Sequence, residues 1–227
     1  MDYLPAYRLK LYRNFKAIDA ADYHGIVRYY ERFEDAMATL EAEEYFDCTL
    51  AYTHALFETG NYAQHVVMCD HLLEIVIMQN IERWGGEDIY ARLLFRKAAA
   101  LFQLQEYPKS EHILRELLKL SPLDQPALYM LRKCLIRQNT TVLMRTRAAA
   151  VALTFLAAAA VAVELLIVRP FFLDYYEKAL LVHNVLLGAG LLVLAGGEFW
   201  QFWRCHRRAV AFAKKMQMRR LGVIDRH

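Results

Sequence analysis

Two long apolar runs near the end of the chain constrain its fold more than any other feature. Residues 148–168 read AAAVALTFLAAAAVAVELLIV, with Glu164 as their one ionisable residue, and residues 179–197 read ALLVHNVLLGAGLLVLAGG. At about 1.5 Å of rise per residue, a helix over either run can cross a hydrocarbon core of about 30 Å. Only the short connector RPFFLDYYEK separates them. The pattern predicts a two-helix transmembrane hairpin, because so short a chain can hardly wrap two such helices inside a soluble core.

Charge is distributed unevenly around these runs. Residues 1–140 contain 16 Lys and Arg against 20 Asp and Glu, and residues 141–227 contain 12 against 5, so the halves carry −4 and +7 within a total of +3. Basic residues precede the first run and follow the second, whereas the two cations of the connector are offset by Asp174 and Glu177. Because positive residues favour the cytoplasmic side, both termini are predicted to be cytoplasmic.

Aromatic residues mark both ends of the predicted hairpin, as they do at the two interfaces of a bilayer. The connector supplies one belt and the end of the second run supplies the other: Phe171, Phe172, Tyr175 and Tyr176, then Phe199, Trp200, Phe202 and Trp203. The polar start MDYLPAYRLK does not have the pattern of a secretory leader. We expect an integral, two-pass protein of a bacterial inner (plasma) membrane, with an organelle surface as the alternative.

Glu164 and His183 form a candidate intramembrane polar pair. Each lies about four residues from the outer end of its run, so an antiparallel hairpin places them at similar depth. A hydrogen bond from Glu164 to His183, or to Asn184, would satisfy groups that are costly in lipid. We expect the pair to join the hairpin or to contact a partner helix. The alternative is a proton or ion relay, for which the deeper parts of both runs offer only Thr154.

The polar half of the chain contains an internal repeat. Three segments align on a Tyr: KLYRNFKAIDAADY, TLAYTHALFETGNY and FRKAAALFQLQEY, which end at Tyr23, Tyr62 and Tyr107. The second and third share a small residue followed three positions later by Leu, and then a turn. These residues are Thr53 with Leu56 and Gly60-Asn61, and Ala98 with Leu101 and Gln105-Glu106.

Over residues 7–123 these features resemble tetratricopeptide (TPR) repeats, with Pro122 closing the third repeat. The resemblance implies a stack of helical hairpins, about three repeats capped by a helix over Asp124–Gln138. The spacings of 39 and 45 exceed the family's 34-residue period, and predict longer second helices, particularly from Tyr62 to about Arg83 before Trp84-Gly85-Gly86. His65 and Ser110 replace the usual Ala of the second helix, and Asn14 replaces the small residue of the first repeat.

The predicted fold is therefore all-α: a TPR-like helical-hairpin stack followed by the transmembrane hairpin. Residues 1–140 are expected to form the cytoplasmic repeat domain, residues 141–203 the hairpin, and residues 204–227 a basic cytoplasmic tail. The tail is predicted to extend the second helix and to place cations near anionic lipid head groups, each contributing about 1 kcal/mol. These cations are Arg204, Arg207, Arg208, Lys214 and Lys215. A nucleic-acid partner is not expected, because no base-reading module is present.

The resemblance to TPR proteins also implies a concave groove that binds a partner protein or peptide. Arg92 and Arg96 match two basic positions with which chaperone-binding members hold a peptide's terminal carboxylates. Leu11, Phe15 and Ala51 replace other clamp residues, so a full carboxylate clamp is not expected. Phe15 and Phe95 instead favour an apolar anchor on the ligand. The expected groove is lined by Leu50, His54, Phe57, Arg92, Phe95 and Arg96; the alternative is that the two arginines are ordinary solvated helix charges.

Other chemistry finds little support in the sequence. The four cysteines form no CxxC pair, and His65, Cys69 and His71 do not share one helical face, so neither a disulfide framework nor a metal site is predicted. Phosphate loops, nucleophile elbows and HExxH are missing. We expect a non-enzymatic adaptor or scaffold without a cofactor. The alternative is an accessory subunit of a membrane transport or energy-coupling complex that uses Glu164 and His183.

Overall fold

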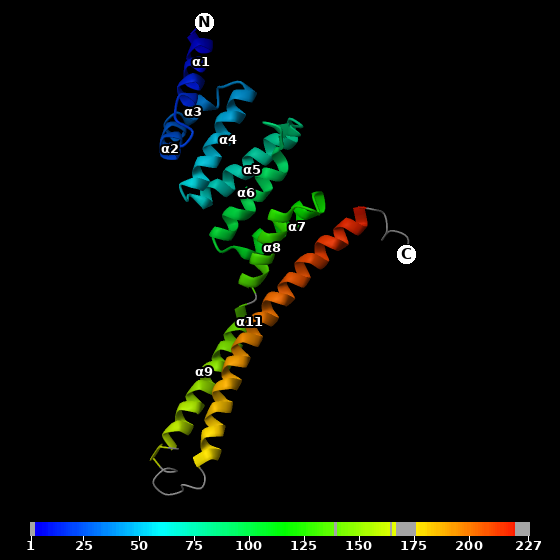
Figure 1. Ribbon diagram of the computed structural model, residues 1–227. Helices are drawn as coiled ribbons and strands as arrows, with labels where there is room; N and C mark the ends of the chain where they lie inside the picture. The colour runs from blue at the N-terminus through cyan, green and yellow to red at the C-terminus, as the bar shows by residue number, and fades with distance from the viewer. Residues whose placement is uncertain (1–2, 139, 164, 167–175, 221–227) are drawn as a thin grey trace. The chain divides into compact units, whose positions relative to one another are not determined.

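The computed structural model describes residues 3–138, 140–163, 165–166 and 176–220, and almost all of them are helical (Figure 1). The predicted all-α class is confirmed. The chain forms two compact units, Met1–Leu131 and Arg132–His227, which we call unit 1 and unit 2. The boundary lies within helix α8 (Gln125–Gln138), so that the last two turns of this helix belong to unit 2. The hairpin region was expected to begin later, at residue 141.

Unit 1 is a series of antiparallel helices. Helix α4 packs against α2 and α5, α5 packs against α6, and α6 packs against α7. Three of these helices begin at the Tyr residues that the repeat pattern selects, Tyr23, Tyr62 and Tyr107. The helices are α1 (Tyr3–Lys16), α2 (Tyr23–Arg32), α3 (Glu34–Met37), α4 (Ala42–Glu58), α5 (Tyr62–Met78), α6 (Ile89–Gln103), α7 (Tyr107–Leu120) and α8 (Gln125–Gln138).

The hairpins α4–α5 and α6–α7 have the same turn, displaced by 45 residues. Gly60 and its equivalent Gln105 both have positive φ, at 83° and 62°. The residue after each donates its backbone N–H to a carbonyl five positions earlier, Asn61 to Leu56 and Glu106 to Leu101, both at 2.9 Å. This is the αL ending that satisfies the last carbonyls of a helix.

The crossing of the two helices repeats as well. In α4–α5 the His65 ring bonds through Nδ1 to the backbone oxygen of Thr53 at 2.7 Å. In α6–α7 the Ser110 hydroxyl donates to the backbone oxygen of Ala98 at 2.8 Å. All four residues are buried. The small residues Thr53 and Ala98 therefore let a polar side chain from the second helix reach the backbone of the first.

The α1–α2 hairpin departs from this pattern. Its equivalent positions are Asn14, which is exposed, and Ile26, which is buried. An apolar Ile has no polar atom for the backbone of α1. In this hairpin the Tyr29 hydroxyl, one turn further along α2, donates to the Leu11 carbonyl of α1 at 3.3 Å. The core that covers it includes Leu11, Phe15 and Met37.

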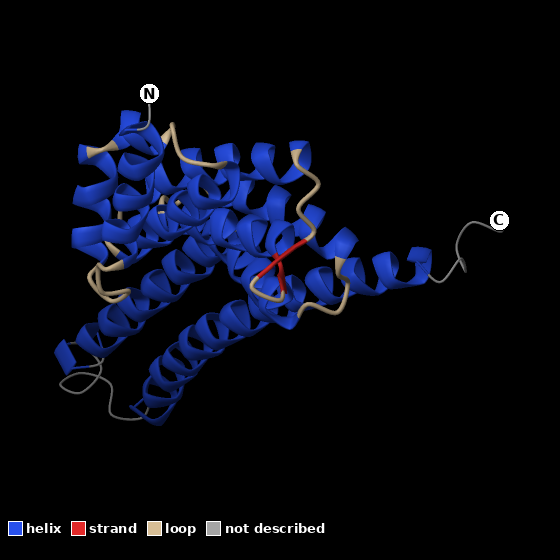
Figure 2. Ribbon diagram, turned by 90° about the horizontal axis from the view of Figure 1, so that it is seen from above, coloured by secondary structure: helices blue, strands red, loops and turns tan. Residues whose placement is uncertain are grey.

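The connection between α5 and α6 holds a short strand pair, which Figure 2 shows in red. Helix α5 ends at Met78, earlier than the predicted end near Arg83, because Asn80 takes positive φ (52°). Strands β1 (Arg83–Trp84) and β2 (Glu87–Asp88) then pair through Gly85 and Gly86, whose φ values of 61° and 86° suit a two-residue hairpin turn. The Trp84 ring packs edge-on against buried Phe46, with centroids 4.9 Å apart.

The helix after the third hairpin begins as the sequence predicts. The carboxylate of Asp124 accepts from the backbone N–H of Ala127 at 3.1 Å, which caps the first turn of α8. Pro126 lies in this turn, where a missing N–H costs nothing.

Unit 2 contains two long helices that pack along each other, α9 (Thr140–Val163) and α11 (Tyr176–Arg220). Both contain stretches long and apolar enough to cross a membrane, Met144–Val163 and Asn184–Met218, and only 11% of the apolar window within each stretch is buried. Helix α11 has 45 residues, or about 68 Å at 1.5 Å per residue. The basic segment after the second apolar run is therefore part of the same helix.

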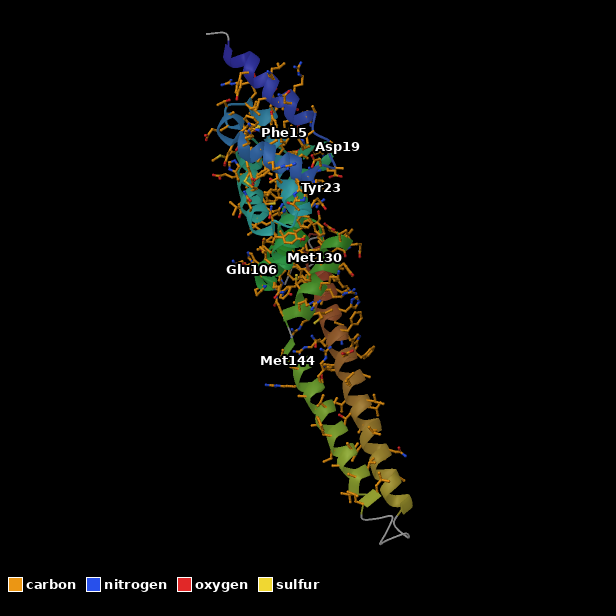
Figure 3. The ribbon with its side chains drawn as sticks, turned by 90° about the vertical axis from the view of Figure 1, so that its left-hand side faces the viewer. Phe15, Asp19, Tyr23, Glu106, Met130 and Met144 are labelled. Carbon is orange, nitrogen blue, oxygen red and sulfur yellow. The ribbon has the colours of Figure 1, made fainter. Side chains whose placement is uncertain are left out.

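Small residues form the contact between α9 and α11. Ala150 and Ala157 of α9 are buried, and so is Gly190 of α11. A Cβ added at Gly197 would lie 2.6 to 2.7 Å from atoms of Thr146, whereas one added at Gly196 would meet nothing within 4 Å. The large apolar side chains of both helices project away from the pair (Figure 3). Among the exposed ones are Phe155, Leu156, Val163, Leu191, Leu192 and Phe199.

Candidate functional site

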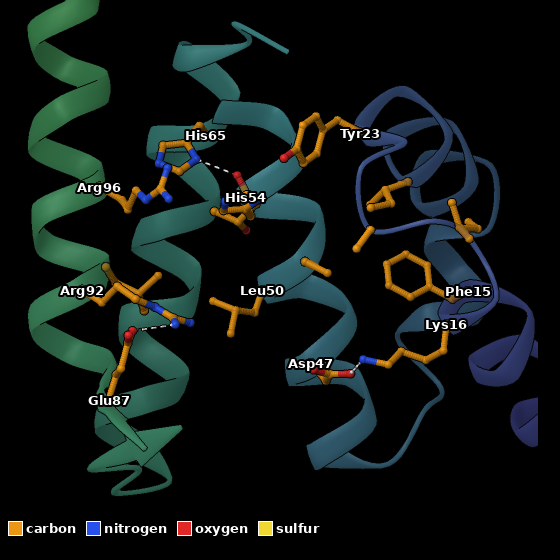
Figure 4. A pocket seen from close by; sticks show the side chains of 16 residues that line it. Phe15, Lys16, Tyr23, Asp47, Leu50, His54, His65, Glu87, Arg92 and Arg96 are labelled. Atoms are coloured by element: carbon orange, nitrogen blue, oxygen red, sulfur yellow. Dashed lines mark hydrogen bonds and ion pairs between the residues drawn. The ribbon is translucent and has the colours of Figure 1, made fainter. Parts of the chain in front are cut away.

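Unit 1 contains a groove of about 650 Å³ between α1–α2 on one side and α6 on the other, with α4 between them (Figure 4). Its apolar lining comes from all of these helices, and Glu87 of β2 lies at one end. Phe15 and Ile26 are buried in the hydrophobic core beneath it. The lining residues are Phe15, Lys16, Ile18, Ala20, Tyr23, Ile26, Asp47, Leu50, Ala51, Thr53, His54, His65, Glu87, Arg92, Leu93 and Arg96.

Four of the six residues expected to line a groove do so: Leu50, His54, Arg92 and Arg96. Phe57 and Phe95 are not among its lining residues. Phe57 lies in the last turn of α4, where its ring packs edge-on against Tyr62 and so closes its own hairpin.

The position of Phe95 follows from the repeat. Phe95 occupies the position in α6 that Leu50 occupies in α4. It would line the groove only if the groove continued beyond α6. The cavity lies instead between α1 and α6, over α4.

Two acidic residues of the groove, Asp47 and Glu87, were not predicted from the sequence. The repeat offers a signal for Asp47, because 45 residues separate it from Arg92 and equivalent positions of stacked hairpins face the same side. Glu87 belongs to the β-hairpin, which has no counterpart between the other repeats. Lys16 and Tyr23 come from the α1–α2 hairpin, the most divergent of the three.

Each cation of the groove is paired with a carboxylate. The Lys16 ammonium lies 2.8 Å from Asp47. Arg92 Nη1 lies 3.0 Å from Glu87, and Arg96 Nη1 lies 3.2 Å from Glu58. The groove therefore presents alternating charges around an apolar floor, and the positive charges of Arg92 and Arg96 are neutralised by neighbouring acids. These pairs are partly exposed, so each is worth about 1 kcal/mol or less.

Arg96 has a second contact, since its guanidinium lies over the Phe57 ring at 5.0 Å from the centroid. The ion pair and the ring together hold Arg96 in one place along the groove. Phe57, although outside the lining, thus positions a residue that is part of it.

His54 lies at the centre of the groove and shares the Glu58 carboxylate with Arg96. Its Nε2 is 3.6 Å from Glu58, and its ring lies 5.7 Å from that of Tyr23. Burial lowers the pKa of His54, and the positive charge of Arg96 lowers it further, against an opposing effect of Glu58. The ring is therefore neutral at pH 7, and offers one donor and one acceptor to a ligand.

His65 and Cys69 form a buried structural pair. Nδ1 of His65 donates to the Thr53 carbonyl, which leaves Nε2 to accept from the Cys69 thiol at 3.3 Å. Burial lowers the pKa of His65 and raises that of Cys69 to about 12, so both groups are neutral. His71 faces elsewhere and bonds to the Tyr45 hydroxyl at 2.9 Å. Within the described ranges, no three His, Cys, Asp or Glu side chains are grouped to hold a metal.

The intramembrane polar pair stays a prediction. Glu164 lies outside the described residues, and His183 is described only as a backbone position of α11. Asn184, the alternative partner, is exposed. The Thr154 hydroxyl donates to the Val151 carbonyl of its own helix at 2.7 Å, so its hydrogen is satisfied within α9.

The five cations predicted to contact lipid lie along the second half of α11 and are all exposed: Arg204, Arg207, Arg208, Lys214 and Lys215. Of these, Arg207 lies over the Trp203 ring at 4.9 Å from its centroid. The four cysteines are buried and form no disulfide with one another: Cys48, Cys69, Cys134 and Cys205.

Comparison of the chain with models of known families, with curated proteins and with solved structures finds no match in any of the three. The assignment of function therefore depends on the groove and on the two apolar helices themselves.

Proposed function

We propose that this protein is a non-enzymatic, membrane-anchored adaptor, whose TPR-like repeat unit binds a segment of a partner protein at the cytoplasmic face. The groove between α1 and α6 is the observation that carries the proposal. The groove extends from α1 across α4 to α6, and it has an apolar floor with polar groups around the rim. Sites that bind peptide segments have the same combination of features.

The repeated hairpins support the TPR-like interpretation. Two of them share turn, crossing and helix start at an offset of 45 residues, and their first helices, α4 and α6, both contribute to the groove. In a stacked array of this kind each unit contacts only its neighbours, and the first helices together make a concave surface. The preferred ligand is a helix or extended segment with an apolar side chain for Leu50 and Leu93, flanked by charges that complement the rim.

The distribution of residue sizes supports membrane anchoring. Helices α9 and α11 contact each other through Ala and Gly and expose Leu, Val, Phe and Trp, the arrangement of helices that pack in lipid. In water such a surface would be an aggregation-prone apolar patch. The basic residues that flank the two apolar runs favour a cytoplasmic location of both termini, which is the side that the proposal requires for the groove.

A photo-crosslinking amino acid tests the groove in the full chain in native membranes. Placed at Ala20, an exposed lining residue, it is expected to capture one partner, and the second substitution Leu50→Arg should abolish that product by placing a charge on the apolar floor. The same crosslinker at Val67, an exposed residue of α5 outside the lining, is the matched control. Identical products from Ala20 and Val67, unaffected by Leu50→Arg, would refute the proposal.

Topology is tested separately by cysteine labelling. A cysteine in place of Tyr175 should react with an impermeant reagent only from the non-cytoplasmic side. The four native cysteines are buried and should react slowly. Labelling of position 175 only from the cytoplasm would exclude the proposed hairpin.

A further inference from the structure

We propose that unit 2 carries an arginine belt that binds anionic phospholipid head groups, and that the lysines near the end of α11 lie outside it. This inference rests on the proposed function, because it takes α9 and α11 to lie in a membrane. The belt consists of Arg137 of α8, Arg145 and Arg147 of α9, and Arg204, Arg207 and Arg208 of α11.

The contacts among the three helices bring these arginines to one end of the α9–α11 pair. Gly197 lies against Thr146, and the next residue on each helix forms the Arg147–Glu198 ion pair at 3.1 Å. One turn further along α11, the Gln201 amide donates to the backbone oxygen of Ile136 at 3.1 Å. The end of α8 and the start of α9 therefore flank α11 at the level where its apolar run ends.

Four exposed aromatic residues mark this level as the membrane interface. Phe199 and Trp200 are 69% and 55% exposed, and Phe202 and Trp203 are 50% and 44% exposed. Amphipathic rings of Trp prefer the head-group layer. Since Arg207 stacks on Trp203, at least one guanidinium is held beside a ring that occupies this layer.

The rise of the helix separates the arginines from the lysines. The head-group layer is roughly 5 to 8 Å thick on each side. At 1.5 Å per residue, Arg204 to Arg208 lie about 10 to 16 Å beyond Gly197, within reach of the layer by their long side chains. Lys214 and Lys215 lie about 26 Å beyond Gly197, more than two Debye lengths of about 8 Å past the layer.

The chemistry of the belt suits lipid phosphate. The six residues that define it are Arg, whose planar guanidinium binds phosphate oxygens in a bidentate manner. Glu198 neutralises Arg147. Within the described part of the chain, the other five arginines form no ion pair, so about five positive charges face the head groups. A surface of this sign attracts the anionic lipids of the cytoplasmic leaflet.

Fluorescence quenching by brominated lipids tests this inference with the full chain in phosphatidylcholine bilayers. The substitution Trp84→Phe leaves Trp200 and Trp203, both in the belt level, as the only tryptophans. Brominated phosphatidylglycerol is expected to bind beside them about tenfold more strongly than brominated phosphatidylcholine. Since each nearby cation contributes about 1 kcal/mol, or a factor of about five, the triple variant R204Q/R207Q/R208Q should lose this preference. The matched variant K214Q/K215Q should keep it within about twofold.

The outcomes separate this inference from the proposed function. If brominated phosphatidylcholine fails to quench the two tryptophans, membrane anchoring itself is refuted. Equal quenching by both lipids, or an equal loss of the phosphatidylglycerol preference in K214Q/K215Q, would refute the arginine belt but not membrane anchoring. Inorganic phosphate should reduce the preference no more than NaCl of the same ionic strength, and a larger effect would reassign the belt to a free anion. Arginine-dependent binding of an oligonucleotide to the reconstituted chain would likewise overturn the lipid assignment.

Discussion

Units 1 and 2 sort their side chains in opposite ways. In unit 1 the helix contacts are made by large apolar residues: Phe46, Leu72 and Leu117 have no exposed surface. In unit 2 the interior contact consists of Ala150, Ala157 and glycines, while the largest apolar side chains point outward. The hydrophobic effect drives the first arrangement in water, whereas in lipid it gives no preference between neighbours, and close packing of small residues decides. The comparison shows that residue size at the helix contacts, and not apolar content alone, distinguishes the two environments.

The largest expected effect tests burial in unit 1. Leu72→Ala should lower the free energy of unfolding by about 2 to 5 kcal/mol, because it leaves a cavity in the cluster that contains Phe46. Leu192→Ala, at a site 75% exposed, should change it by less than about 0.5 kcal/mol. Urea unfolding of the full chain in detergent, followed by Trp84 fluorescence with Trp200 and Trp203 replaced by Phe, measures unit 1 for Leu72→Ala. An SDS titration followed by Trp200 and Trp203 fluorescence, with Trp84 replaced by Phe, measures unit 2 for Leu192→Ala. Equal losses at the two sites would contradict the contrast between the units.

The next effect tests the small-residue contact of unit 2. Gly197→Leu should weaken the α9–α11 association by about 1 to 3 kcal/mol, because its side chain overlaps Thr146. Gly196→Leu is the matched control, since a Cβ there meets nothing within 4 Å. An SDS titration followed by Trp200 and Trp203 fluorescence, in a Trp84→Phe background, reports the association. If both variants dissociate at the same SDS concentration, the helices do not pack as described.

A smaller effect concerns pH and is confined to unit 1. Burial lowers the pKa of His65 in the folded state, so below the ordinary value of 6.5 the unfolded chain binds more protons than the folded one. Stability is therefore complete above pH 6.5 and falls as the pH decreases toward 5. His54 contributes in the same direction. The urea midpoint should be lower at pH 5 than at pH 7.5, and the difference should shrink in His65→Asn. An unchanged pH dependence in that variant would assign it to other groups.

The smallest effect compares the two equivalent turns within unit 1. Gln105 takes a positive φ that costs a side chain about 1 kcal/mol, whereas Gly60 takes the same conformation freely. Gln105→Gly should raise the free energy of unfolding by about 0.5 to 1 kcal/mol, and Gly60→Ala should lower it by a similar amount. Thermal denaturation of the two variants beside the parent checks both signs. Destabilisation by Gln105→Gly would show that the two turns are not equivalent.

Local patterns predicted the helices of unit 1 well. The Tyr that starts each second helix is a local signal, and so are the small residue and the turn of the α4–α5 and α6–α7 hairpins. The structure has these features where they are expected. The end of α5 was misplaced because the turn at Asn80 depends on a positive φ that carries no strong residue signature. The strand pair that follows was missed for the same reason, since it contains only two residues on each side.

The groove was predicted less completely than the helices. Its charge balance depends on partners that are distant in sequence: Arg96 and Glu58 are 38 positions apart, and Lys16 and Asp47 are 31 apart. No periodicity in one helix reveals such pairs. Leu50 and His54 were found because the repeat register assigns them to the inner face of α4, but the neutralisation of Arg92 and Arg96 required the packed hairpins.

The sequence by itself determined that this chain is mostly helical and that two of its helices are apolar enough to span a bilayer, because periodicity and hydropathy are properties of neighbouring residues. Only the tertiary structure decided which faces meet. It turned Gly197 toward Thr146 and left Gly196 open, and it placed a carboxylate beside each cation of the groove. The physical reason is that contacts between helices depend on register and shape across space, which a linear pattern does not contain.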